Sequence, residues 1–96
     1  MSDVLNAAVE ALTARLADSD FQNSAKFTIN GEGSVVADTD GVRISDEETD
    51  VTLTADADVF EDMMSGDLDP TSAFMTGRLT IDGNMGIAIQ LAGELS

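Results

Sequence analysis

The 96-residue sequence contains no cysteine, histidine, tryptophan or tyrosine. Without cysteine, disulfide bonds and thiolate chemistry are excluded. Without histidine, the chain lacks the most usual general base near neutral pH and the commonest metal ligand. Four phenylalanines are the only aromatic residues, so a core has to be built mainly from aliphatic side chains and methionine. We therefore expect no enzymatic activity, no catalytic residues, no metal site and no cofactor.

Basic residues are also scarce, and nineteen acidic residues give the chain a net charge of −15. The four basic residues are Arg15, Lys26, Arg43 and Arg78. This balance argues against nucleic-acid binding by phosphate neutralisation and against stable association with anionic membranes. No apolar run approaches the length of a membrane span, and the N-terminus lacks the layout of a signal peptide. We expect a cytoplasmic protein, and the sequence does not specify its oligomeric state.

Hydrophobic periodicity predicts an amphipathic helix over residues 3–18. Its apolar positions are spaced by four, three and four residues and fall on one stripe: Leu5, Val9, Leu12 and Leu16. Membrane-surface helices usually carry a basic polar face. Here the polar face mixes both charges, so we expect the helix to pack on a sheet.

Alternating and β-branched residues predict strands at 26–30, 34–38, 42–45, 51–54 and 78–82. Asn30-Gly31 and Asp40-Gly41 separate the first three strands. Each pair predicts a two-residue hairpin turn, because both of its residues accept positive φ.

Three helices are predicted in the second half of the chain. Residues 56–65 have a helical pattern that Gly66 ends. A short helix begins at Pro70, which suits a first helical position, and ends at Gly77. A nearly apolar helix opens at Asn84.

These elements predict an α+β fold, with a five-stranded, mainly antiparallel (mixed) sheet and the helices packed on one face. The first three strands should form a meander. The connection from strand 51–54 to strand 78–82 contains helices and is long enough for a crossover. No linker or repeat divides the chain, so we expect a single domain over residues 1–96.

An ordered set of residues in segment 67–89 is the most informative motif. Its members are Asp69, Pro70, Phe74, Met75, Gly77, Arg78, Leu79, Ile81, Gly83 and Asn84. The set resembles the sterol carrier protein-2 family of lipid-binding domains. There, an Asp-Pro…Phe-Met-x-Gly-(Lys or Arg)-Leu-x-Ile-x-Gly-(Asn or Asp) run precedes a C-terminal helix. The resemblance extends more loosely back to residue 21.

The resemblance implies non-catalytic binding or transfer of a hydrophobic ligand in a cavity between sheet and helices. Such a ligand would be a fatty acid, fatty acyl thioester, phospholipid or sterol-like lipid. Methionine is frequent around this corner of the fold and adapts to irregular apolar shapes. We predict that the ligand contacts Phe60, Met64, Phe74, Met75, Leu79, Met85 and Ile89. The competing hypothesis is a structural or interaction module with a filled cavity, accessory to another protein.

A calcium site is the main alternative use of the acidic residues. With Gly41 at the sixth place of an EF-hand loop, Asp38, Asp40 and Glu47 take the third, fifth and twelfth places. Val36 then takes the first place, where a carboxylate is required. The flanking segments are predicted strands, so a β-hairpin explains these residues better.

Three further polar residues are assigned structural roles. Asp56 and Asp69 are predicted to be helix N-caps. Arg78 could meet the carboxylate of a fatty acid, but we predict that it points away from the sheet and pairs with a neighbouring acid.

Overall fold

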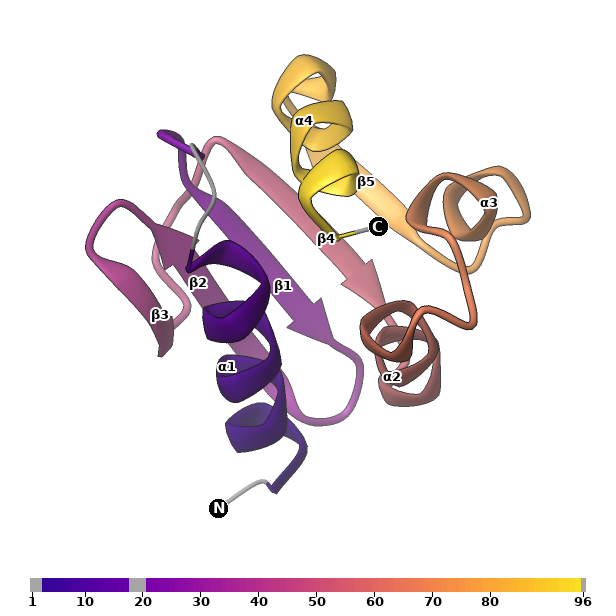
Figure 1. The fold of residues 1–96 in the computed structure, drawn as a ribbon, viewed down its shortest axis with the longest axis horizontal. Coiled ribbons are helices and arrows are strands. Elements are labelled where there is room, and N and C mark those ends of the chain that lie inside the picture. Colours follow the sequence, from indigo (N-terminus) through magenta and orange to yellow (C-terminus); the bar gives the residue numbers. More distant parts are fainter. Residues whose placement is uncertain (1–2, 18–20, 96) are drawn as a thin grey trace.

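Five strands form one mixed sheet with the order β3-β2-β1-β4-β5 (Figure 1). The structure, a computed structural model, describes residues 3–17 and 21–95. The strands are β1 (Ala25–Ile29), β2 (Gly33–Asp38), β3 (Gly41–Ile44), β4 (Val51–Ala55) and β5 (Thr80–Gly83). Neighbouring strands are antiparallel except β1 and β4, which are parallel. The predicted α+β class and mainly antiparallel sheet are confirmed.

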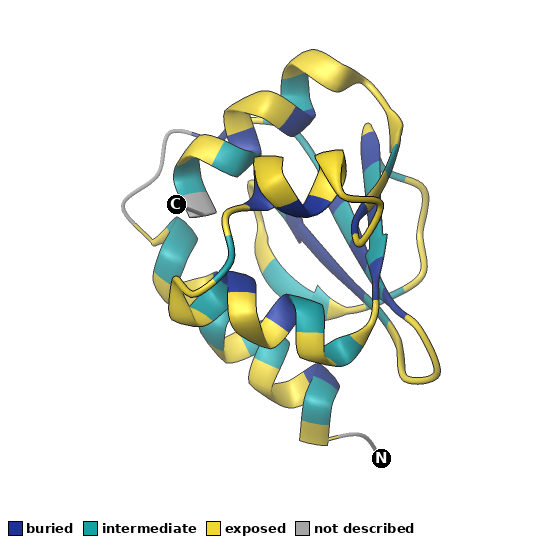
Figure 2. Cartoon of the chain, turned by 90° about the vertical axis from the view of Figure 1, so that its right-hand side faces the viewer, coloured by how far each residue is buried: buried dark blue, intermediate teal, exposed yellow. Residues whose placement is uncertain are grey.

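The helices are α1 (Asp3–Leu16), α2 (Ala57–Ser65), α3 (Pro70–Met75) and α4 (Met85–Leu95). They cover one face of the sheet, which Figure 2 shows from the side. Helix α1 packs over β2 and β3, and α4 packs over β4 and β5. The predicted N-terminal helix thus ends at Leu16, and residue 18 lies outside the described residues. The connection through α2 and α3 returns β5 antiparallel beside β4, so the crossover runs instead from β1 through β2 and β3 to β4.

The core lies between the sheet and these helices. Alternate residues of β1 and β4 are buried, as the sequence pattern predicts: Ala25, Phe27, Ile29, Val51, Leu53 and Ala55. Phe27 meets Phe60 of α2 edge to face, with ring centroids 6.0 Å apart. On α1, Leu5 and Leu12 are buried, while Val9 and Leu16 pack against the core from its margin. The predicted stripe is therefore the inner face of α1.

The opposite face of the sheet carries two of the four basic residues. Residues paired across neighbouring strands point to the same face. Lys26 pairs in register with Val36, and Val36 pairs with Arg43. Since Phe27 points toward the helices, Lys26 and Arg43 point away from them. Val36 between them is fully buried without joining the main core.

Both predicted hairpins are present, but their turns differ from the prediction. In the first, three residues separate the paired Ile29 and Gly33, and Gly31 has φ +81°. In the second, Asp38 pairs with Gly41, so Gly41 (φ +123°) begins β3 and does not occupy the loop. Among the described residues only glycines have positive φ. The prediction that Asn30 and Asp40 adopt positive φ together with the glycines that follow them was therefore wrong.

Asp69 and Asp56 both occupy N-cap positions, as predicted, but only Asp69 caps its helix with its side chain. The Asp69 side chain accepts the Ser72 N–H of α3, as predicted. The side chain of Asn84 accepts the Ile87 N–H in the first turn of α4 at 3.2 Å. Asp56 takes the N-cap position of α2, but its side chain does not cap the helix. Its carboxylate accepts a 3.0 Å hydrogen bond from Asn30 instead, and this bond ties α2 to the β1–β2 turn.

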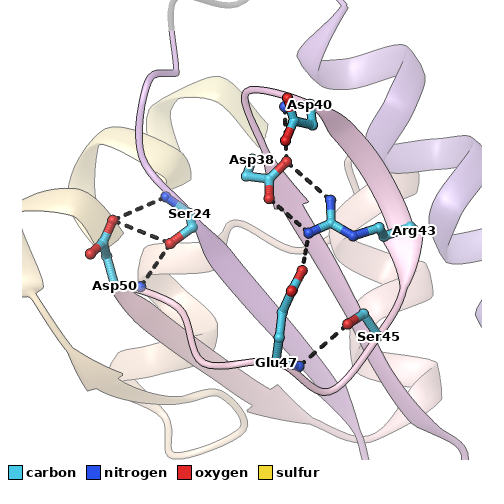
Figure 3. Close-up of polar contacts among 7 residues, drawn as sticks. All are labelled: Ser24, Asp38, Asp40, Arg43, Ser45, Glu47 and Asp50. Atoms are coloured by element: carbon cyan, nitrogen blue, oxygen red, sulfur yellow. Dashed lines mark hydrogen bonds and ion pairs between the residues drawn. The ribbon is translucent and has the colours of Figure 1, made fainter.

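Gly83 is a tight joint between β5 and α4. Its φ is +108°, and a Cβ atom there would lie 2.5 Å from the carbonyl oxygen of Asp50. The same carbonyl accepts the Asn84 N–H at 3.1 Å. The Asp50 carboxylate is held by the backbone N–H and hydroxyl of Ser24, which precedes β1 (Figure 3). The start of α4 is thus fixed to the start of β4, and only glycine fits the joint.

We expect Gly83→Ala to destabilise the fold by roughly 2 to 4 kcal/mol, since it adds a clash to an unfavourable backbone conformation. Gly93→Ala in α4 is the matched control, because a Cβ there meets nothing within 4 Å and its φ is not positive. The control should be neutral or stabilising by up to about 1 kcal/mol. Urea unfolding of both variants measures the difference. Equal stabilities would show that the joint is not tight.

The excess of acidic residues predicts salt-dependent stability. Asp38, Asp46 and Glu47 form ion pairs with Lys26 and Arg43. Four basic residues cannot neutralise nineteen acidic ones, so the carboxylates repel one another overall. We expect the melting temperature to rise as NaCl increases from about 10 mM to about 150 mM, because the Debye length shortens from about 30 Å to about 8 Å. An unchanged melting temperature would contradict this expectation.

Candidate functional site

An apolar pocket of about 290 Å³ lies between α3, α4 and the edge of the sheet; we call it the α3–α4 pocket. Its lining comes from β4, β5, both helices and the residues that join them: Leu53, Pro70, Thr71, Phe74, Met75, Leu79, Ile81, Met85, Ala88, Ile89 and Ala92. No charged residue is among them. The pocket can bury an apolar molecule, but it offers no acid, base or nucleophilic carboxylate for catalysis.

Helical spacing places the α4 residues on the pocket. Met85, Ile89 and Ala92 recur at intervals of four and three, so they share one side of the helix. Ala88 and Leu91 lie on the adjoining side and are buried in the core. Helix α4 is therefore anchored by one side, while the other side forms a pocket wall.

The large apolar side chains of this pocket are unusually exposed. Phe74, Met75, Met85 and Ile89 are 41%, 79%, 42% and 70% exposed. They are four of the five large hydrophobic residues that are exposed in the described part of the chain; the fifth, Ile44, lies on β3 at the far edge of the sheet. Exposed apolar side chains gathered around one hollow are typical of a binding surface.

A second apolar pocket, of about 340 Å³, lies between α1, α2 and β1; we call it the α1–α2 pocket. It is lined by Val4, Ala7, Ala8, Ala11, Leu12, Phe27, Ile29, Ala57, Phe60, Glu61, Met64 and Ser65. Phe27 and Leu53 pair in register across β1 and β4 and belong to different pockets. The two pockets are therefore neighbours on the same face of the sheet.

The structure divides the seven predicted ligand-contacting residues between the two pockets. Five of them line the α3–α4 pocket: Phe74, Met75, Leu79, Met85 and Ile89. Phe60 and Met64 line the α1–α2 pocket instead. Both lie on α2, which packs beside α1. The seven residues therefore do not line a single pocket, and their contact with a ligand stays a prediction.

Sequence reasoning missed the contribution of α1 to a pocket. Ala7, Ala8 and Ala11 lie beside the leucine stripe and, being small, leave space between α1 and α2. A run of small residues flanking an amphipathic stripe was the available signal. It is weak, because alanine is common in any helix.

The whole described fold matches the sterol carrier protein-2 pattern. A sequence profile described as the SCP-2 sterol transfer family matches residues 4–96, so the chain belongs to this family. Hydroxysteroid dehydrogenase-like protein 2 of Danio rerio is 42% identical over 72 residues, which is 75% of this chain and 14% of that protein. Sterol carrier protein 2 of Rattus norvegicus is 46% identical over 63 residues, 65% of this chain and 10% of that protein. The chain thus spans a small part of these relatives.

Solved structures share the fold at lower identity. The solution structure of Aedes aegypti sterol carrier protein-2 in complex with palmitate has a TM-score of 0.81 and 21% identity, covering 100% of this chain and 97% of that one. Sterol carrier protein domain 2 of Helicoverpa armigera has a TM-score of 0.79 and 24% identity, covering 96% and 85%. Across the described residues, no helix is both long and apolar enough to cross a bilayer.

The residues considered for calcium form an ion-pair cluster on β2, β3 and the following loop (Figure 3). Arg43 donates to both carboxylate oxygens of Asp38, at 3.1 and 2.9 Å, and also pairs with Glu47. Asp38 accepts the Asp40 N–H as well, within the hairpin turn. A guanidinium therefore lies where the EF-hand alternative needs a cation. In the described residues, no group of three or more acids could hold a metal ion.

Arg78 does not behave as predicted. It precedes β5, its side chain is exposed, and it forms no ion pair with any of the described residues. The expected pairing with a neighbouring acid was wrong. Arg78 also does not line the α3–α4 pocket, although it follows α3 and precedes the lining residue Leu79.

The Asp38–Arg43 pair predicts a pH-dependent contribution to stability. Its hydrogen bonds with Arg43 lower the pKa of Asp38 below its ordinary value. The ion pair therefore contributes its full stabilising free energy at pH values above the pKa of Asp38 in the unfolded chain. This contribution is lost as the pH falls through the lower pKa that Asp38 has in the folded chain. We expect Asp38→Asn to lower the melting temperature near pH 7, and the difference from wild type to narrow below about pH 4. A difference that stays constant with pH would contradict this expectation.

Proposed function

We propose that the chain binds one hydrophobic molecule in the α3–α4 pocket and carries it without covalent chemistry. One observation supports this most strongly: Phe74, Met75, Met85 and Ile89 remain exposed around an apolar hollow of about 290 Å³. A ligand seated there would remove these side chains from water. Each buried methylene group of an acyl chain contributes about 0.8 kcal/mol.

Family membership supports the same function. The family is described as one of sterol transfer, and an Aedes aegypti protein of the same fold is described in complex with palmitate. These descriptions belong to the relatives, and they make a lipid the natural candidate for this pocket. Because the chain covers a small part of these relatives, their other activities are not assigned to it.

The buried residues of α4 limit how the pocket can close over a ligand. Leu91 and Ala88 are buried, so moving the whole helix would expose core surface. Met85 and Ile89 are both exposed. The unbranched Met85 side chain can turn onto a ligand, whereas the β-branched Ile89 side chain is stiff and gives a fixed apolar wall. We propose that the Met85 side chain closes the pocket while the helix stays in place. The alternative, an interaction module with a filled cavity, is less favoured because both apolar hollows are open.

Three methionines make a matched test of this proposal. Met85 lines the α3–α4 pocket, Met64 lines the α1–α2 pocket, and Met63 is buried at 1% exposure and lines neither. We expect Met85→Ala to cost about 1 kcal/mol or less in stability, because the side chain has few contacts to lose. It should weaken binding of a fluorescent fatty-acyl probe several-fold. Probe titration and urea unfolding measure the two effects.

The other two variants are the controls. Met63→Ala should cost roughly 2 to 5 kcal/mol, as expected for a packed core site. Met64→Ala should leave probe affinity unchanged, since its pocket is not the proposed site. Weaker binding in Met64→Ala with normal binding in Met85→Ala would move the ligand to the α1–α2 pocket. No saturable binding to the wild type would contradict the function itself.

A further inference from the structure

The α3–α4 pocket offers nothing that pairs with an anionic headgroup. Its lining is apolar except for the hydroxyl and backbone of Thr71. Of the acids next to the lining in the chain, Asp69 precedes Pro70, whereas Asp82 pairs in register with Thr52 and therefore lies with Lys26 on the face of the sheet opposite the helices. A carboxylate or phosphate brought to this mouth would lose hydration without gaining a cation.

None of the four basic residues is part of the lining. Lys26 and Arg43 lie on the opposite face of the sheet, paired with acids. Arg15 of α1 donates a hydrogen bond to the Met64 carbonyl, on the side of the α1–α2 pocket. Arg78 is exposed and outside the lining. Of the four, Arg78 alone stands next to the lining in the chain.

We propose that the α3–α4 pocket is selective for uncharged lipids, such as long-chain alcohols, esters or sterol-like molecules, and discriminates against anionic ones. This inference rests on the proposed function and specifies its ligand class. A net charge of −15 on a molecule 32 Å across creates a negative potential over its whole surface. For a uniformly charged sphere of this size, the potential weakens binding of a monovalent anion about tenfold at 150 mM salt and about a hundredfold at 10 mM.

The experiment compares two probes that differ only in charge: a fluorophore-labelled dodecanoic acid and its methyl ester, at about pH 7.5. We expect the ester to bind at least tenfold more tightly at 150 mM NaCl, with the gap widening toward a hundredfold at 10 mM. Affinity for the ester should change less than about twofold with salt, because an uncharged ligand does not feel screening.

Two exposed threonines provide matched charge variants. Thr71→Lys places a cation on the pocket lining, while Thr39→Lys adds the same charge at the β2–β3 turn, across the sheet. Thr71→Lys should strengthen binding of the acid several-fold, as expected for one exposed ion pair. Thr39→Lys should change it less than about twofold, because the added charge is remote and screened. Thr39→Lys should not alter binding of the ester. Because Thr71 lines the pocket, the effect of Thr71→Lys is read as the ratio of acid to ester affinity, and Thr71→Gln, which adds length without charge, should leave that ratio unchanged.

The outcomes separate this inference from the function it rests on. If neither probe binds, the proposed function fails. If the ester binds and the acid binds equally well at both salt concentrations, the pocket is a lipid site but the selectivity is wrong. If the acid binds more tightly, and Arg78→Gln removes that advantage without affecting the ester, then Arg78 anchors anions and the inference is overturned.

Discussion

The parallel pairing of β1 with β4 is the constraint on which the rest of the structure depends. It joins the N-terminal meander to the C-terminal half and sets Phe27 opposite Leu53, both almost completely buried. Phe60 packs edge-on against Phe27, and Met63 lies beside it in the same core. This contact holds α2 against β1, while α1 and α4 cover the two sides of the sheet. The two apolar pockets therefore flank these packed residues, one toward α1 and one toward α4. In a domain this small, the packed residues fill the centre of the core, and the space on either side of them remains open as the two pockets.

The α3–α4 pocket follows from how the chain leaves and returns to the edge of the sheet. Gly83 lets β5 turn directly into α4 against the Asp50 carbonyl, so α4 starts close above β4. Farther along α4, Ala88 and Leu91 are buried in the core. The first turn of α4, which begins with Met85, forms part of the pocket wall at the edge of the sheet. Helix α3 has only six residues and contributes Ala73 and Pro70 to the buried interior. Its Phe74 and Met75 are left outside. The exposed apolar surface is therefore a consequence of short helices at an edge, and a lipid would cover it.

The sequence predicted the fold well because its signals there are redundant. Alternation in β1 and β4 and the leucine stripe of α1 each identify a buried face, and the family motif fixes their arrangement. Predictions that depended on a single residue were less accurate. Asp56 looks like an N-cap, yet its carboxylate bonds to Asn30, which comes near only in the folded chain. For the site, Phe74 to Ile89 come together because one continuous helix–strand–helix segment contains them. Phe60 and Met64 face the other pocket because α2 packs against α1, a contact between segments more than 40 residues apart that local patterns do not encode.

Affinity and selectivity have separate physical origins in this molecule. The apolar lining supplies affinity that scales with the buried area of any hydrocarbon, so it distinguishes poorly among lipids with similar chains. Selectivity must then come from charge outside the lining, and in the chain as a whole nineteen acidic residues outnumber four basic ones. The sheet contributes to this separation, since its register turns Lys26 and Arg43 to the face opposite the helices. On that face they cover Val36 and pair with Asp38, Asp46 and Glu47. Cations that could have received an anionic headgroup are thereby used to hold the outer face of the sheet together, and the pocket is left in a negative field.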